Sequence, residues 1–406
     1  MHITILALGS TGDILPYIAL GKGLKKARYQ VRFITFENFA PHVREGGLDF
    51  HPIPGDPRSL VAQGGSNILT MARSFGSIAE EYTRALSAPH LRETDLLINQ
   101  LPGGIFGIDL AEISGIQMIM AAVIPLAYTN TFPMMGFPEI SLPGYNHVTY
   151  SISENVVWLM FQKVINHWRT QQLGLPSITR KEYFGTNGTR GKLIINGFSP
   201  VVVERPLDWG ENVHIAGYWF PDDPGWQPPP DLVNFIEGGQ PPVFIGFGSM
   251  PVKNPAKTTQ TILAALKETN QRAILHTGWS GLGETELPDH VFKIDYAPYS
   301  WLFPRMAMVI HHGGSGTTAF GLRAGVPSCA VPLLGFDQIY WGKRIAALGA
   351  GPPPIPFRNL TVKNLSHVIR QATSDPVFRQ KAAALGEKIW AEKGIENAVG
   401  IINQLL

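Results

Sequence analysis

The chain alternates between short apolar runs and longer amphipathic runs. In its first half the strand-like runs are Ile3–Leu8, Val31–Phe36, Leu96–Asn99 and Met118–Val123. The helical patterns between them are Leu15–Ala27, Ala40–Gly46, Asn67–Leu86 and Ile105–Ser114. Strands that alternate with helices predict a parallel sheet with both faces covered. The alternation therefore favours the α/β class.

The same alternation restarts beyond a proline-rich segment. The later strand-like runs are Val243–Phe247, Ala273–His276, Val291–Ile294, Met308–Ile310 and Ala330–Leu333. Because 406 residues exceed one ordinary core, we expect two Rossmann-like domains with parallel sheets, 1–216 and 231–385. They face a central cleft, since such sheets bind ligands at the carboxyl ends of their strands. Residues 217–230 form a stiff linker, and 386–406 form a C-terminal helical segment that could return to the first domain.

A histidine- and glycine-rich turn follows one of these strands. After Met308–Ile310 the chain reads His311-His312-Gly313-Gly314-Ser315-Gly316-Thr317-Thr318, and a helical pattern closed by Gly325 follows. A strand, a glycine turn and a helix start direct free backbone N–H groups and a helix dipole at one point. A phosphate fits that point, with His312 and the hydroxyls as further donors. The alternative is a turn that serves packing alone.

Other strand ends carry polar or aromatic groups, each with a structural alternative. Asp13, after Gly9-Ser10-Thr11-Gly12, is either a general base or a helix N-cap. Gly248-Ser249 is either a second phosphate contact or an ordinary turn. Asp337-Gln338 either holds vicinal sugar hydroxyls or caps a helix, and Trp279 either stacks on a base or anchors packing.

The segment 128–161 is unusually rich in large apolar groups. We expect a proline-broken loop over Phe132–Tyr150 and an amphipathic helix over about Val156–Leu173. The large side chains predict an adaptable apolar pocket or, alternatively, a satellite core beneath a long loop. The candidate pocket residues are Phe132, Met134, Met135, Phe137, Tyr145, Tyr150 and Trp158.

Composition excludes several classes of protein. The net charge is +2, without a basic cluster of the kind that binds nucleic acid. Charged residues make up only 16% of the chain, so part of its surface or a cleft is unusually apolar. Cys329 stands alone, which excludes an internal disulfide and a cysteine-based metal site. Met1–Leu8 reads as a strand rather than a signal peptide, and we expect a soluble, cytoplasmic protein.

Several motifs together resemble one enzyme family. His311–Gly325 is similar to the donor motif HHGGAGTTAAGLRAG, and Asp337-Gln338 falls on its DQ pair. Gly9–Pro16 resembles an N-terminal GTRGDVQP-type motif. Further similar segments are Tyr145–Tyr150, Gly217–Phe220 and Gly246–Met250. The chain thus resembles the GT-B fold glycosyltransferases that use nucleotide sugars, above all the sterol 3-β-glucosyltransferase group and, more distantly, the antibiotic glycosyltransferases.

The resemblance implies an inverting transfer of glucose from UDP-glucose to a hydroxyl of a sterol or similar polycyclic alcohol. Asp13 falls where many relatives place a histidine base, so the resemblance favours the base over the cap. It implies donor contacts at Ser10, Thr11, Gly12, Gly248, Ser249, Trp279, Ala297, His312, Gly314, Ser315, Gly316, Thr317, Asp337 and Gln338. The residues of the apolar pocket would bind the acceptor. No metal cofactor is expected, because Asp-x-Asp and HExxH motifs are absent.

Two departures from the family leave alternatives open. Plant relatives place a ribose-binding Glu eight residues after the motif histidine, where this chain has Phe320. The membrane-binding modules of the fungal enzymes are missing, so we expect at most weak peripheral membrane contact. The alternatives are a macrolide or polyphenol glycosyltransferase that uses a UDP- or dTDP-sugar, and a non-catalytic protein that binds hydrophobic ligands.

Overall fold

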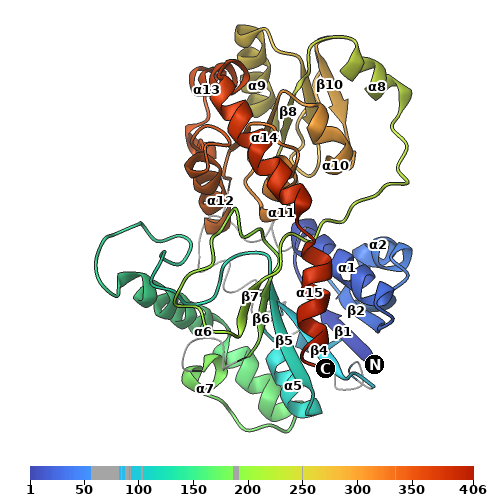
Figure 1. Ribbon diagram of the computed structural model, residues 1–406, viewed down its shortest axis with the longest axis vertical. Helices are drawn as coiled ribbons and strands as arrows, with labels where there is room; N and C mark the ends of the chain where they lie inside the picture. Colours follow the sequence, from blue (N-terminus) through green and yellow to red (C-terminus); the bar gives the residue numbers. More distant parts are fainter. Residues whose placement is uncertain are drawn as a thin grey trace. The chain divides into compact units, whose positions relative to one another are not determined.

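Two compact units make up the chain in a computed structural model. It describes residues 1–55, 82–83, 85–86, 91, 93–101, 104–185, 192–248, 250–333 and 335–406, without the side chain of Phe336. One unit comprises Met1–Pro221 with Lys393–Leu406, and the other comprises Asp222–Glu392. Each unit has its own parallel sheet flanked by helices, which confirms the predicted α/β class (Figure 1).

The sheet of the first unit has seven strands in the order β3-β2-β1-β4-β5-β6-β7. Its strands are β1 His2–Leu6, β2 Gln30–Phe36, β3 Asp49–Ile53, β4 Leu96–Leu101, β5 Gln117–Ala122, β6 Ile194–Asn196 and β7 Val213–Ile215. Its helices are α1 Thr11–Lys26, α2 Ala40–Glu45, α5 Gly107–Ser114, α6 Tyr145–Gln171, α7 Arg180–Phe184 and α15 Gly394–Asn403. Ile3 of β1 pairs with Val31 on one side and Leu96 on the other, so the first strand is central. Most of the expected helix Asn67–Leu86 lies outside the described residues.

The sheet of the second unit has five strands in the order β10-β9-β8-β11-β12. Its strands are β8 Val243–Gly246, β9 Ala273–His276, β10 Val291–Ile294, β11 Met308–His311 and β12 Ser328–Ala330. Its helices are α8 Pro230–Glu237, α9 Pro255–Thr269, α10 Tyr299–Leu302, α11 Ser315–Arg323, α12 Phe336–Ala347, α13 Val362–Ser374 and α14 Pro376–Ala391.

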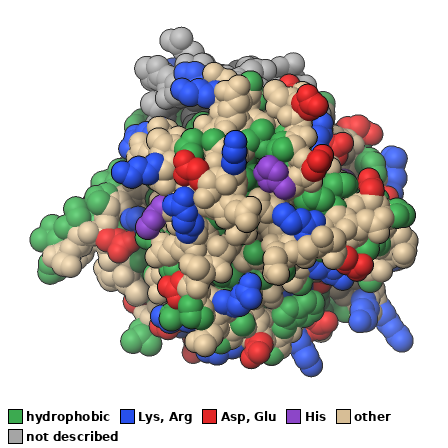
Figure 2. All heavy atoms as spheres, turned by 90° about the horizontal axis from the view of Figure 1, so that it is seen from above, with side chains coloured by type: hydrophobic (Ala, Val, Ile, Leu, Met, Phe, Trp, Pro, Cys, Tyr) green, Lys and Arg blue, Asp and Glu red, His purple; other side chains and the backbone are tan. Residues whose placement is uncertain are grey.

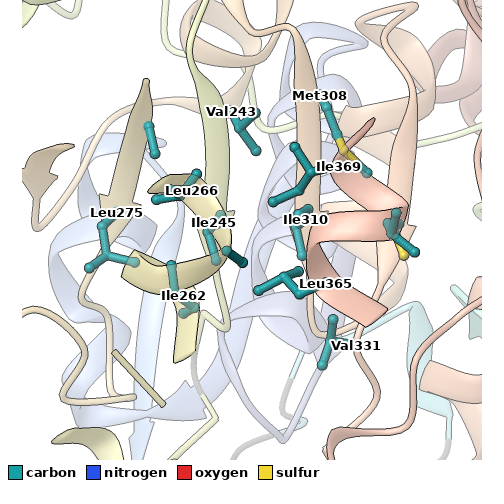
Figure 3. Packing of buried hydrophobic residues seen from close by; sticks show 14 of the residues in the cluster. Val243, Ile245, Ile262, Leu266, Leu275, Met308, Ile310, Val331, Leu365 and Ile369 are labelled. Carbon is teal, nitrogen blue, oxygen red and sulfur yellow. The ribbon is translucent and has the colours of Figure 1, made fainter. Parts of the chain in front are cut away.

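Apolar side chains bury both faces of this second sheet. Val243 and Ile245 of β8 join a cluster with residues of α9 and α13 (Figure 3). Phe244, between them in sequence, joins a separate cluster with residues of α8 and α10. Alternate residues of a strand point to opposite faces, so the continuous apolar run supplies both layers. This packing leaves the strand ends as the natural place for polar chemistry.

The last helix, α15, packs within the first unit. A Cβ atom on Gly23 of α1 would lie 2.1 Å from Cγ2 of Ile395, so the two helices are in close contact. The Asn397 side chain donates to the carbonyl of Ala216 at 2.9 Å, and the Tyr29 hydroxyl bonds Asn403 at 2.7 Å. Residue 386, where the expected C-terminal segment starts, lies inside α14, and the chain enters the first unit again at Lys393.

The limits of one helix and one strand differ from the expectations. Helix α6 begins at Tyr145 rather than near Val156, because Gly144 adopts a φ of +76° directly after Pro143 and no later proline interrupts the helix. The expected strand Ala330–Leu333 is wrong, since β12 pairs with β11 only over Ser328–Ala330. Pro332 has no N–H to continue the ladder. No helix in the described part of the chain is both long and apolar enough to cross a bilayer.

Candidate active site

The turn between β11 and α11 leaves backbone donors without intrahelical partners. Gly313 adopts a φ of +92°, and its N–H donates to Nδ1 of the buried His311 at 3.0 Å. Helix α11 begins at Ser315, and its N-cap, Gly314, has no side chain that could accept from the first turn. The amides of Ser315, Gly316 and Thr317 therefore face outward at the positive end of the helix. This arrangement suits an anion.

The ring of His312 lies between two glycines beside this helix start. A Cβ on Gly248 would be 3.2 Å from its Cε1, and a Cβ on Gly314 would be 2.3 Å from its Nε2. Burial lowers the pKa of His312 to about 4, so the ring is neutral near pH 7. A neutral imidazole carries one N–H, which it can donate to a phosphate oxygen. Its Nδ1 has no hydrogen-bond partner among the described residues.

The ends of β8 and β9 meet next to His312. Gly248 adopts a φ of +56°, and its carbonyl accepts the N–H of Trp279 at 3.0 Å. A Cβ on Gly278 would lie 2.5 Å from that carbonyl oxygen, so only glycine fits there. The half-buried Trp279 is thus held beside the turn. Ser249 lies outside the described residues, and its proposed phosphate contact stays a prediction.

The first turn of α12 lies against the turn between β11 and α11. A Cβ on Gly313 would lie 2.6 Å from the backbone oxygen of Gln338. The Gln338 side chain is buried, and its Oε1 accepts the N–H of Leu333 at 2.9 Å. Asp337 is in the first turn of α12, where the N-cap is Gly335 rather than Asp337. The structure therefore brings Gly248, Trp279, His312, Gly314 and Gln338 into one group of contacts.

Two further residues of the second unit that the family motifs single out make packing contacts. Ala297 is buried in the cluster that contains Phe244 and Phe303, so its predicted donor contact would have to use its backbone. Phe320 packs edge-on against Tyr299 at 5.9 Å, and the guanidinium of Arg323 lies 5.0 Å from its ring centre. An aromatic contact thus fills the place where the family motif has a ribose-binding carboxylate.

Sequence reasoning missed one buried histidine near this group. His276 ends β9, and burial lowers its pKa. Its Cε1 would lie 3.1 Å from a Cβ on Gly278. Its place at the carboxyl end of a strand was the available signal, but one histidine at a strand end is more often a core residue than a ligand.

Asp13 lies at the start of α1 in the first unit, three residues after the N-cap Ser10. Its Oδ2 accepts the backbone N–H and the hydroxyl of Ser10, both at 2.9 Å. The residue is therefore the N3 member of a capping box, and the expectation that it might be the N-cap is corrected. Burial raises the pKa of Asp13 above its ordinary value, against the two bonds from Ser10, which lower it.

Glycine at position 9 makes room for this carboxylate. Gly9 adopts a φ of +146°, and a Cβ there would lie 2.6 Å from Oδ2 of Asp13. Thr11 is half-buried, while Gly12 is exposed with open space around its Cα. The motif thus presents a carboxylate with a raised pKa next to a bare stretch of backbone.

The candidate acceptor residues form two groups in the first unit. Tyr150 is buried and stacks on Tyr128 at 5.0 Å, and its hydroxyl bonds the carbonyl of Phe132 at 3.4 Å. Oγ1 of Thr149 accepts the N–H of Met134 at 2.7 Å. Helix α6 therefore holds the Phe132–Met134 loop in place.

The remaining candidate acceptor residues separate by burial. Trp158 packs against Tyr183 of α7 at 5.6 Å, which favours a structural role for that residue. Met135 is buried, whereas Phe137 and Tyr145 are half-buried. Phe137 and Tyr145 are thus more accessible than Met135 and Trp158.

Comparisons with known proteins cover the whole chain. Residues 3–92 match the glycosyltransferase family 28 N-terminal domain, and residues 260–405 match the C-terminal domain of erythromycin biosynthesis protein CIII-like proteins. A sterol 3-beta-glucosyltransferase of Arabidopsis thaliana is 36% identical over 100% of this chain and 68% of its own length. A sterol 3-beta-glucosyltransferase of Aspergillus oryzae is 35% identical over 99% of this chain, which spans only 30% of that protein. Among solved structures, the glycotransferase of kitacinnamycin superposes with a TM-score of 0.76 at 17% identity, over 99% of this chain and 98% of that one.

Proposed function

The chain has the GT-B fold and belongs to the glycosyltransferase family of the sterol 3-beta-glucosyltransferases, and from this premise we propose that it transfers glucose from UDP-glucose to the hydroxyl of a sterol or similar polycyclic alcohol, with inversion. The observation that carries the proposal is the β11–α11 turn, where uncapped amides and the neutral His312 meet. These donors suit a diphosphate, both when the donor binds and when UDP leaves with increased negative charge.

Each unit has its own part in the proposed reaction. In the first, Asp13 takes the proton of the acceptor hydroxyl, and the oxygen attacks the anomeric carbon from the face opposite UDP. The bond between that carbon and the β-phosphate oxygen breaks, and its electron pair leaves with UDP. In the second, α11 and His312 stabilise the leaving diphosphate. The raised pKa of Asp13 supports its role, since a base with an ordinary carboxyl pKa would be weak.

A screen of acceptors and donors tests this proposal directly. The purified chain is incubated with UDP-glucose or dTDP-glucose and with sterols, triterpenes, macrolides and flavonoids, and glucosides are detected by mass spectrometry. The proposal expects UDP-glucose and a sterol 3-hydroxyl to be among the preferred pairs, with the β-anomer as product. Preference for dTDP-glucose with macrolides would support the natural-product alternative. Absence of any transfer and of UDP-glucose hydrolysis would support a binding protein.

Glucosyl transfer is expected to survive removal of divalent metal ions. In the proposed reaction the amides of α11 and the His312 ring meet the charge of the diphosphate, so no cation is needed for that purpose. Among the described residues, no three His, Cys, Asp or Glu side chains are grouped so that they could hold a metal ion. Rates with excess EDTA should match untreated rates. Loss of transfer in EDTA with recovery in Mg²⁺ or Mn²⁺ would contradict this prediction.

Replacing Phe137 with Asp is expected to raise the acceptor KM by at least about tenfold, because a charge in an apolar pocket disfavours an apolar ligand. The KM for UDP-glucose should stay unchanged, since Phe137 is not among the predicted donor contacts and the diphosphate donors at the β11–α11 turn belong to the other unit. Phe137 is preferred to the buried Met135, where Asp would also disturb folding. Phe50→Asp on β3 is the matched control, a half-buried aromatic away from this segment. An equal rise in both KM values would refute the assignment.

A further inference from the structure

A stripe of aliphatic side chains lies exposed on α6 and on the loop before it. Its members, called the apolar stripe here, are Ile140, Leu142, Val148, Ile152, Val156 and Leu159. Each exposes between 40% and 70% of its surface. The spacing 148, 152, 156 and 159 places the last four along one side of the helix. Figure 2 shows apolar side chains gathered at the left edge, where Figure 1 places the loop before α6.

The orientation of α6 is fixed by a second, buried face. Tyr150, Trp158, Ile165 and Trp168 are all buried on that face. Arg169, at the end of the helix, is also buried and pairs with Asp109 and Glu112. The helix therefore cannot turn its apolar stripe inward without exposing a larger apolar surface. Among the described residues, the core therefore takes up the opposite side of α6 and leaves the stripe exposed.

The segment that carries the stripe has almost no charge. From Ile140 to Gln162 the only Asp, Glu, Lys or Arg residue is Glu154. Its side chain is only 14% exposed and is paired with Arg180 at 3.1 Å. Bringing this segment into an apolar environment would therefore remove no unpaired carboxylate or ammonium from water, which is the main cost of such a transfer.

We propose that the apolar stripe docks the first unit onto the surface of an uncharged lipid bilayer. This inference rests on the proposed function, because a sterol-like acceptor is itself a bilayer constituent. The stripe is continuous with the candidate acceptor segment, since the same helix carries Tyr145 and Tyr150 and holds the Met134 loop through Thr149. Contact with lipid at the stripe thus brings the acceptor segment to the pool of acceptor.

The composition of the stripe favours lipid over a second copy of the chain. Its members are all Ile, Leu or Val, whereas the core of a protein interface is enriched in aromatic residues and Arg. The stripe also lacks the Lys and Arg residues by which many interfacial helices bind anionic lipid. Binding should therefore come from apolar burial alone, and it should be insensitive to salt and to anionic lipid.

Vesicle flotation tests this inference with the full chain. Wild-type protein is mixed with phosphatidylcholine vesicles, with and without cholesterol or phosphatidylserine, at low and high salt. The stripe variant is Val148→Gln with Ile152→Gln and Leu159→Gln. The matched control is Ile113→Gln with Leu207→Gln and Val377→Gln, three exposed aliphatic residues outside the segment. Circular dichroism melting and glucosylation of a water-soluble acceptor show that each variant is folded and active.

The expected result is flotation of wild type and control with neutral vesicles, at either salt concentration, and a partition coefficient at least about tenfold lower for the stripe variant. The stripe variant should also lose activity toward sterol in vesicles while keeping it toward the soluble acceptor. Wild type that does not float, or floats only with phosphatidylserine at low salt, would overturn the inference. So would a dimer that the stripe variant dissociates. Absence of transfer to every acceptor would instead count against the proposed function, and flotation would still decide the docking.

Discussion

Replacing Asp13 with Asn is expected to lower kcat by roughly 10²–10⁴-fold, the usual cost of losing a general base. The change keeps the size of the side chain, which matters because a Cβ on Gly9 would lie only 2.6 Å from Oδ2. It also keeps an oxygen that can accept the Ser10 bonds, so α1 should stay capped. UDP affinity by calorimetry should be almost unchanged, since the diphosphate donors proposed at the β11–α11 turn lie in the other unit.

The pH profile gives a second signature of the same group. A base acts only when ionised, and burial raises the pKa of Asp13. The value of kcat/KM should therefore fall as pH drops through this raised pKa, at a higher pH than for an unperturbed carboxyl. Residual activity of Asp13→Asn should lack this acidic limb.

A capping aspartate elsewhere in the chain provides the control. Asp375 caps α14, and its Oδ1 accepts the N–H of Val377 at 2.8 Å. Asp375→Asn should change stability slightly and kcat hardly at all. If Asp13→Asn behaved in the same way and kept more than about a third of wild-type kcat, where loss of a base would remove nearly all of it, Asp13 would be a cap only.

Replacing His312 with Ala is expected to weaken UDP binding by roughly 10- to 150-fold, because a hydrogen bond to a charged group contributes about 1.5–3 kcal/mol. Transfer should slow as well, since the same donor meets the charge that develops on the leaving diphosphate. His312→Asn keeps an N–H donor and should recover part of the loss. Calorimetry with UDP near pH 7, where burial keeps His312 neutral, measures the effect.

An exposed histidine of the same unit is the matched control. His367 lies on the surface of α13, and His367→Ala should leave UDP affinity at the wild-type level. UDP affinity that is equally unaffected in His312→Ala would show that this ring does not contact the diphosphate. The role of the β11–α11 turn would then rest on its backbone amides alone.

Local sequence was sufficient to predict much of the fold and of the candidate donor site. The strands Ala273–His276 and Val291–Ile294 have the predicted limits, because uninterrupted apolar runs between helical patterns leave few alternatives. The helix start after His311–Gly314 was also predictable, since paired glycines between a strand and a helix mark a turn. Strands β3, β6 and β7 were missed: β3 contains Pro52, and β6 and β7 have three residues each, too few to show a period.

The positions where prediction went wrong depend on a single backbone angle or on which of two nearby residues caps a helix. Helix α6 starts early because Gly144 takes a positive φ, and a list of prolines does not reveal that choice. Asp13 turned out to be the third residue of a capping box rather than the N-cap. The pattern Ser-x-x-Asp at positions 10–13 was visible. Both Ser and Asp are favoured at the N-cap, however, so the pattern alone did not show that Ser10 is the N-cap and Asp13 the N3 residue.

The sequence by itself determined the class of fold, the family and the strand ends at which polar groups gather, because these follow from local periodicity and motifs. Only the tertiary structure decided which groups meet. Gly248 and Gly314 flank His312, and Gly278 and Trp279 lie against Gly248, because three strands end side by side. It likewise decided that six aliphatic residues, four on α6 and two in the loop before it, face solvent. Burial is a property of what packs against a residue, and residues distant in the chain supply that packing.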